Sequence, residues 1–160
     1  MAKASKPIPD GFRTVTPYLT LRDAAAGIEF YKRALGAQEL MRMPGPGGKG
    51  VMHGEIKIGD SIIFLSDESP QGKTRAPESL GGATGSIFLY VPDVDAAFDR
   101  AVKAGARSEM PPTDMFWGDR FGSLVDPFGH HWGLATHVED VPPKEMEQRA
   151  KKAMAEMATK

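Results

Sequence analysis

The feature that most constrains the fold is an internal repeat with an offset of about 70 residues. The segment Leu19–Asp23 is similar to Leu89–Asp93, 70 positions later, and Ala34–Ala37 is similar to Lys103–Ala106, 69 positions later. A sustained offset predicts two copies of one structural unit. The remaining interpretation is that two unrelated α+β stretches are similar by accident.

Each copy has the pattern of a strand, a helix and three further strands. In the first copy Asp23 is placed to cap a helix over 24–35, and Gly36 follows as the left-handed residue that commonly ends a helix. The second copy repeats this pattern, with Asp93 and Gly105 at the two ends of its helix. Apolar and β-branched runs predict strands over 15–21, 38–43, 51–58 and 62–66, then over 86–91, 107–110, 120–125 and 131–137.

The repeat divides the chain into five segments of an α+β protein. We expect an N-terminal arm (1–12), a first βαβββ module (13–66), a linker loop (67–85), a second βαβββ module (86–140) and a C-terminal amphipathic helix (141–160). The last segment has a stripe of Met and Ala side chains that needs a surface to pack on. A homodimer is therefore expected, since symmetric dimers are common among small domains.

Composition excludes several classes of function. The 160 residues have a formal net charge of −1, which argues against nucleic acid as a partner because a basic face is expected there. No apolar stretch approaches the roughly 20 residues of a membrane helix, and the first ten residues have no apolar signal-peptide core. The chain has no cysteine, which excludes disulfides, a Cys nucleophile and Cys-ligated metal. We expect a cytoplasmic protein without a membrane partner.

Several motifs together resemble those of a known family. They are Val15–Leu19 with Ile28–Tyr31, Gly59–Ser61 with Leu65–Glu68, Leu89–Asp95, Trp117–Arg120 and Asp126–His130. At this length, a repeated βαβββ unit is similar to the vicinal oxygen chelate (glyoxalase/bleomycin-resistance/dioxygenase) superfamily, and within it to the PhnB-like group. The resemblance covers residues 13 to 140. It implies two curled mixed sheets around a concave cup, with helices on the convex face and ligands in the cup.

The resemblance also implies where a metal would be held in related enzymes. By motif spacing, the four ligand positions fall on Thr16, Phe64, Ser86 and Gly133. Two of these offer no donor atom and two offer only hydroxyls, which are poor ligands for a divalent ion. We therefore expect no metal and no other cofactor. A divalent metal is the minority interpretation, and an unconventional set of His53, Glu55 and His131 is kept as one form of it.

Strand alternation indicates which side chains face the cup. His53 and Glu55 face inward, and the repeat offset places Arg120 opposite His53, so these three are the candidate catalytic residues. They could equally be an ordinary strand histidine and an ion pair that braces the sheet. The aromatic side chains of the predicted pocket could line a ligand site or simply fill the cup. The full predicted pocket comprises Thr16, Tyr18, His53, Glu55, Phe64, Ser86, Phe88, Tyr90, Trp117, Arg120 and His131.

These features predict a protein that binds a small organic molecule in the cup without the superfamily's metal. One alternative is a metal-dependent lyase, isomerase or dioxygenase that uses displaced ligands. Another is a metal-free acid/base enzyme with His53 or Glu55 as the base and Arg120 orienting an anionic group. Fold resemblance does not choose between them, because this superfamily includes catalysts of several reactions and non-catalytic drug binders.

Overall fold

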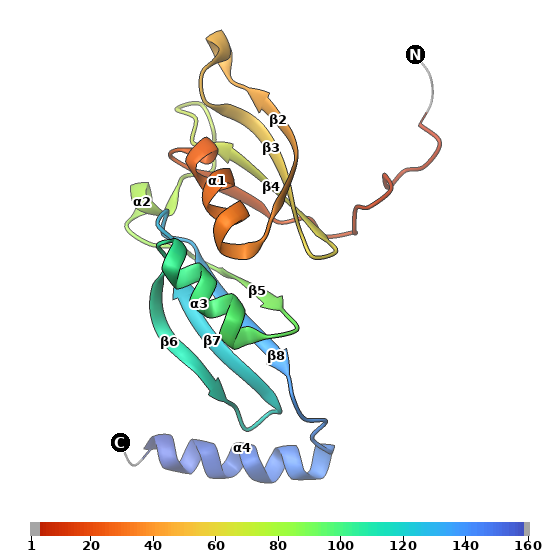
Figure 1. Ribbon diagram of the computed structural model, residues 1–160, viewed down its shortest axis with the longest axis vertical. Helices are drawn as coiled ribbons and strands as arrows, with labels where there is room; N and C mark the ends of the chain where they lie inside the picture. Colours follow the sequence, from red (N-terminus) through yellow and green to blue (C-terminus); the bar gives the residue numbers. More distant parts are fainter. Residues whose placement is uncertain (1–3, 159–160) are drawn as a thin grey trace. The chain divides into compact units, whose positions relative to one another are not determined.

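The computed structural model describes residues 4–158, and the chain divides into two compact units, Met1–Ala83 and Thr84–Lys160. Each unit contains one four-stranded sheet with a helix packed against it (Figure 1). The boundary between the units lies inside the predicted linker 67–85. The predicted α+β fold of two βαβββ modules followed by a C-terminal helix is confirmed.

Unit 1 runs through one complete βαβββ module. Its sheet has the strand order β1-β4-β3-β2, in which β1 is parallel to β4 and the other neighbours are antiparallel. A single 3₁₀ turn lies between β2 and β3, and a short helix, α2, follows the sheet. The elements are β1 (Tyr18–Leu21), α1 (Ala24–Leu35), β2 (Gln38–Pro44), η1 (Pro46–Gly48), β3 (Val51–Ile58), β4 (Ser61–Asp67) and α2 (Pro77–Leu80).

Unit 2 repeats this topology and adds one helix. The strand order is β5-β8-β7-β6, again with one parallel pair, β5 with β8. The elements are β5 (Ser86–Tyr90), α3 (Val94–Ala104), β6 (Arg107–Asp114), β7 (Asp119–Val125), β8 (His131–His137) and α4 (Pro143–Ala158). Within residues 4–158 no helix is long and apolar enough to cross a membrane.

The two module helices begin in the same way. The carboxylate of Asp23 accepts a hydrogen bond from the Ala26 amide at 2.9 Å, which satisfies one of the free N–H groups of the first turn of α1. The sheet supplies a second acceptor, because Asp67 Oδ1 accepts from the Ala24 amide at 2.7 Å. In unit 2 the hydroxyl of Thr136 accepts from the Val94 amide at 2.8 Å. Each helix start is thus fixed to the end of a central strand.

The core of each unit lies between its helix and one face of its sheet. In unit 1 the fully buried Ile28 and Tyr31 of α1 lie in a core shared with Ile56 and Leu65 of the sheet. The unit 2 core has Phe98 of α3 with the buried sheet residues Leu124, Trp132 and Leu134. We call the opposite face of each sheet, which no module helix covers, its open face.

Three segments differ from the sequence prediction. The strand expected over 15–21 begins only at Tyr18, and the linker expected to be a loop contains α2. β6 continues through Pro111 and Pro112 to Asp114, because it is an edge strand, where a missing N–H removes no required ladder bond. The ladder between β6 and β7 is irregular at this point, between Met110 and Thr113.

Candidate functional site

The open face of unit 1 carries a cluster of three rings. Tyr18 and Phe64 are register partners on the parallel strands β1 and β4, and their ring centroids are 5.7 Å apart at 84°. The His53 ring on β3 packs edge-on against Phe64, with a centroid distance of 4.8 Å. Phe12 of the N-terminal arm lies against the same Phe64 ring at 5.8 Å. The structure therefore brings together three predicted pocket residues from three strands.

Both ring nitrogens of His53 have a side-chain partner. Nδ1 lies 3.2 Å from the Tyr18 hydroxyl, and Nε2 lies 3.3 Å from Glu55 Oε1. His53 and Glu55 are partly buried, with side-chain exposures of 26% and 18%. They point the same way because they are two residues apart on β3, whereas the intervening Gly54 faces α1, where an added Cβ would lie 3.3 Å from Ile28.

The open face of unit 2 is built around a stacked ring pair. The rings of Phe88 on β5 and Phe121 on β7 are nearly parallel and stacked, with centroids 5.4 Å apart and an angle of 3° between the planes. They flank Gly133 of β8, where an added Cβ would lie 2.8 Å from Phe121 and 2.9 Å from Phe88. Tyr90 continues the aromatic surface from Phe88, and Trp117 continues it from Phe121.

A buried carboxylate anchors one end of this aromatic surface. Asp119, only 4% exposed, accepts hydrogen bonds from the Tyr90 hydroxyl at 3.0 Å and from the Trp117 indole N–H at 3.1 Å. His137 Nδ1 lies 2.7 Å from its other oxygen, and His137 Nε2 lies 3.0 Å from Asp140. Asp119 thus fixes three side chains of the open face and its edge.

These contacts set the directions of three pKa shifts. Burial raises the pKa of Asp119, but the bonds from His137, Tyr90 and Trp117 together outweigh it, so the net shift is downward. The bond to Asp140, followed by the bond to Asp119, raises the pKa of His137. The pKa of Tyr90 is raised because its hydroxyl donates to Asp119.

Asp119 was absent from the sequence-predicted site. The signal that could have found it is alternation along β7, where Asp119 lies two residues before Phe121 and therefore on the same face. A carboxylate on that face beside Tyr90 and Trp117 has donors within reach.

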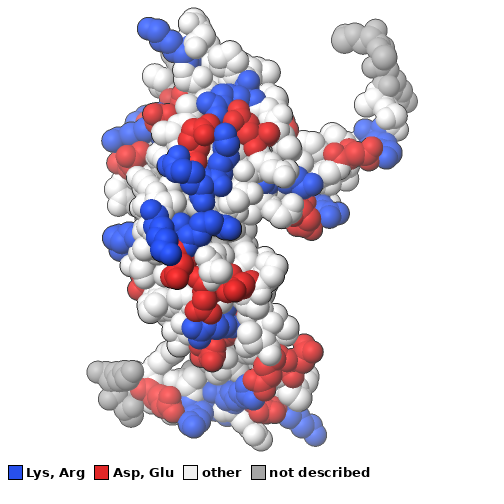
Figure 2. All heavy atoms as spheres, in the orientation of Figure 1, with Lys and Arg blue, Asp and Glu red and all other residues white. Residues whose placement is uncertain are grey.

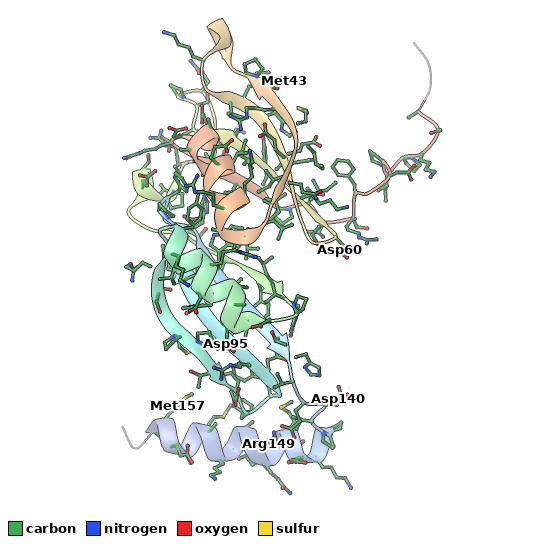
Figure 3. All side chains as sticks on the ribbon, viewed as in Figure 1. Met43, Asp60, Asp95, Asp140, Arg149 and Met157 are labelled. Atoms are coloured by element: carbon green, nitrogen blue, oxygen red, sulfur yellow. The ribbon has the colours of Figure 1, made fainter. Side chains whose placement is uncertain are left out.

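The predicted inward position of Arg120 was wrong. Arg120 lies on the helix-covered face of its sheet, where its guanidinium forms bonds of 2.7 and 2.8 Å to Asp95 of α3 and of 3.1 Å to Asp114. Gly122, two residues on, confirms this phase because its added Cβ would contact Phe98 of α3. The bonds to Asp95 and then Asp114 raise the pKa of Arg120 above its ordinary value. Figure 3 shows Asp95 on α3, and Figure 2 shows charges of both signs mixed over the face of the molecule in that view.

The remaining predicted pocket residues lie at the margins. Thr16 precedes β1 and is partly buried, and Ser86 is the exposed first residue of β5. Ser86 is the register partner of His131, whose Nδ1 lies 3.1 Å from Glu109 of β6. His131 is therefore part of a pair within unit 2 at the start of β8.

The four positions that would hold a metal in related enzymes do not fit one. The Phe64 ring is part of the aromatic cluster, and Gly133 has no donor atom and lies where even an added Cβ would press on two phenyl rings. Thr16 and Ser86 would supply only hydroxyls, which are weak donors for Zn²⁺, Fe²⁺ or Ni²⁺. Among residues 4–158 no three His, Asp or Glu side chains form a group able to hold an ion. No catalytic step is therefore assigned to a metal.

Comparison with known proteins identifies the family. The model of the Glyoxalase/Bleomycin resistance protein/Dioxygenase superfamily matches residues 13–134, which span both βαβββ modules. The chain belongs to this superfamily. The match agrees with the duplicated topology, since it extends from before β1 into β8.

Three similar proteins illustrate the relationship. An uncharacterized protein of Mycobacterium tuberculosis is 45% identical over 136 residues, which cover 83% of this chain and 79% of the relative. TioX from Micromonospora sp. ML1 is 26% identical with a TM-score of 0.62, covering 79% of this chain and 99% of TioX. A PhnB protein from Bacillus cereus matches with a TM-score of 0.59 at 19% identity, covering 78% and 99% of the two chains. This last likeness concerns the fold alone.

Proposed function

We propose that this superfamily member binds a small organic molecule with a planar apolar part on the open face of a sheet, without a divalent metal. The observation that carries the proposal is the exposure of aromatic side chains on each open face: Tyr18 of unit 1 is 54% exposed, and Phe88 and Tyr90 of unit 2 are 47% and 66% exposed. Aromatic rings gathered on one exposed face commonly mark a binding surface, because stacking against a ligand removes their apolar area from water.

Rigidity supports the same function. The rings come from paired strands, and Tyr90 and Trp117 are both held by hydrogen bonds to Asp119. A surface whose side chains are already ordered loses less conformational entropy when a ligand binds. The donor chemistry at Thr16, Phe64, Ser86 and Gly133 supports binding without a metal.

The experiment is a thermal-shift screen of planar organic molecules, followed by titration of each hit against variants. A ligand at 100 times its Kd stabilises the native state by about 2.7 kcal/mol, which such a screen detects. Phe88→Ala is expected to weaken binding about tenfold, equivalent to about 1.4 kcal/mol. Val102→Ala is the matched control, because Val102 is an exposed apolar residue on α3, in the helix layer of the same unit. Equal affinities of the two variants would refute the proposed surface.

Elemental analysis tests the metal-free part of the proposal. Protein purified without chelator is expected to contain far less than one equivalent of divalent metal. A near-stoichiometric content of zinc, iron, nickel or manganese would instead favour the metal-dependent lyase, isomerase or dioxygenase.

A metal-free acid/base reaction is a second candidate function, favoured by the 3.3 Å contact between His53 and Glu55. Arg120 is not part of this candidate site, because its guanidinium pairs with Asp95 on the helix-covered face of the unit 2 sheet. The two functions separate once a ligand is known: turnover that is lost in His53→Ala while binding persists identifies the enzyme.

A homodimer and a cytoplasmic location remain predictions. The stripe on α4 leaves Met154 and Met157 exposed by 67% and 73%. Figure 3 labels Met157 on this helix. Sedimentation equilibrium of the full chain, compared with Met154→Lys, tests whether this stripe joins two copies.

A further inference from the structure

The direction of each hydrogen bond around His53 follows from the partners. A carboxylate only accepts, so His53 Nε2 must carry a proton and donate it to Glu55. In a neutral imidazole the other nitrogen then has a free lone pair, so Nδ1 accepts the proton of the Tyr18 hydroxyl. With Glu55 ionised and the imidazole neutral, the three groups form one chain in which Tyr18 donates to His53 and His53 donates to Glu55.

The Tyr18 end of this chain is the accessible one. Tyr18 is 54% exposed, whereas the side chains of His53 and Glu55 are 26% and 18% exposed. Since the hydroxyl proton is directed at His53, the lone pairs of the oxygen are available to a ligand on the open face. Rings of Phe64 and Phe12 lie next to it and supply an apolar wall.

We propose that Tyr18, His53 and Glu55 form a proton relay that binds a weakly acidic O–H group, of the phenol or enol class, and takes up its proton. This deepens the proposed function and rests on it, because the ligand must lie on the open face. The ligand O–H bond breaks and its proton bonds to Tyr18 Oη, while the original Tyr18 proton moves to His53 Nδ1. One proton has then passed from the ligand to His53, no electron pair leaves either molecule, and the ligand is an oxyanion.

Glu55 decides which ligands this relay suits. Its negative charge stabilises the imidazolium that forms, as the third member of a base-orienting triad does. The same charge disfavours a carboxylic acid, which arrives already ionised at neutral pH and has no proton left to give. A phenol or enol arrives neutral, stacks on the ring cluster and becomes charged only after the relay has acted.

The first test needs no ligand. Long-range ¹H–¹⁵N NMR of the full chain reports which nitrogen of His53 carries the proton. The Nε2–H tautomer is expected to predominate in the wild type, and its share should fall in Glu55→Ala. A predominant Nδ1–H tautomer in the wild type would overturn the relay, because Tyr18 could then not donate to that nitrogen.

The second test uses 4-nitrophenol, whose phenolate has its own visible absorbance. At a pH well below the pKa of the free probe, where little of it is ionised, wild-type protein is expected to increase the ionised fraction severalfold. Tyr18→Phe should still bind the probe but no longer ionise it. Val102→Ala is the control and should behave as wild type, because Val102 lies on α3 in the helix layer of the other unit.

The outcomes separate the relay from the proposed function. Probe that binds wild type without added ionisation overturns the relay and leaves small-molecule binding intact. Failure of wild type to bind 4-nitrophenol overturns the phenol class of ligand, whereas the screen and Phe88→Ala judge the proposed function independently.

Discussion

The two units have the same topology but place their aromatic rings differently. Matching registers make Phe64 equivalent to Gly133, since each is the partner of the first-strand residue Tyr18 or Phe88. In unit 1 the central strand β4 carries the aromatic ring of Phe64 at this position. In unit 2 the centre is glycine, and Phe88 and Phe121 stack across it.

The open faces of the two units differ in chemical character as well as in packing. His53 and Phe121 are equivalent, because each precedes a glycine, Gly54 or Gly122, that pairs with a buried leucine of the central strand. Unit 1 therefore has a titratable ring where unit 2 has a phenyl ring. The backbone thus fixes which positions meet on the open face, while the residue at each position decides whether that face is polar or stacked.

The largest expected effect concerns the two helix starts. Asp67→Ala should destabilise the protein by about 2–4 kcal/mol, because a carboxylate that accepts from both the Ala24 and Val51 amides is lost. Thr136→Ala removes a neutral hydroxyl that bonds Val94 and Val91, and should cost about 1–2 kcal/mol. Urea denaturation measures both. Thr136→Ser is the control that retains the hydroxyl, and equal losses for the two alanine variants would show that the helix starts are equivalent in energy.

The second prediction concerns the glycine at the centre of unit 2. Gly133→Ala should cost about 1–3 kcal/mol, because the new Cβ would press on the rings of Phe88 and Phe121. Phe88→Ala in the same chain removes one of these rings and should recover part of the loss. A double-mutant cycle by denaturation measures the coupling. Additive losses would mean that the stacked pair does not restrict residue 133.

The third prediction compares pH dependence at equivalent strand ends. Glu68 follows β4, and bonds from the Ala76 amide and Ser79 lower its pKa, so its stabilisation is present above the ordinary 4.5 and is lost as the pH falls through the lower folded value. His137 ends β8 and its pKa is raised, so its stabilisation is present below the ordinary 6.5 and is lost as the pH rises through the higher folded value.

Hydrogen-exchange protection factors measure this contrast locally. Acid should reduce protection of the Ala76 amide, which donates to Glu68, and mild alkali should reduce protection of the Val138 amide beside His137. Glu68→Gln and His137→Gln should each flatten one response and leave the other. Parallel pH responses at both amides would contradict the opposite signs.

The smallest effect is expected for Arg120. Arg120→Gln should leave ligand affinity unchanged, because Arg120 lies on the helix-covered face of its sheet and not on the open face. It should alter stability only slightly, because its ion pairs with Asp95 and Asp114 are exposed to solvent. Titration of a screening hit checks this, with Phe88→Ala as the positive control. A marked loss of affinity would show that Arg120 takes part in ligand binding.

The sequence was sufficient for much of the site in unit 1. Alternation along β1, β3 and β4 predicted that Tyr18, His53 and Phe64 share a face, and the measured ring contacts agree. In unit 2 the same reasoning used the wrong offset in β7, aligning Arg120 instead of Phe121 with His53. Side chains alternate with a period of two, so a slip of one residue reversed the assigned face and hid Asp119.

By itself the sequence determined the duplicated βαβββ order, the helices between Asp23 and Gly36 and between Asp93 and Gly105, and the superfamily, because caps and hydrophobic periods are local signals. Only the tertiary structure decided the partners: Tyr18 with His53, Asp119 with Tyr90 and Trp117, and Arg120 with Asp95. These contacts join residues on different elements, and their existence depends on strand register, which is fixed by long-range packing and not by neighbouring residues.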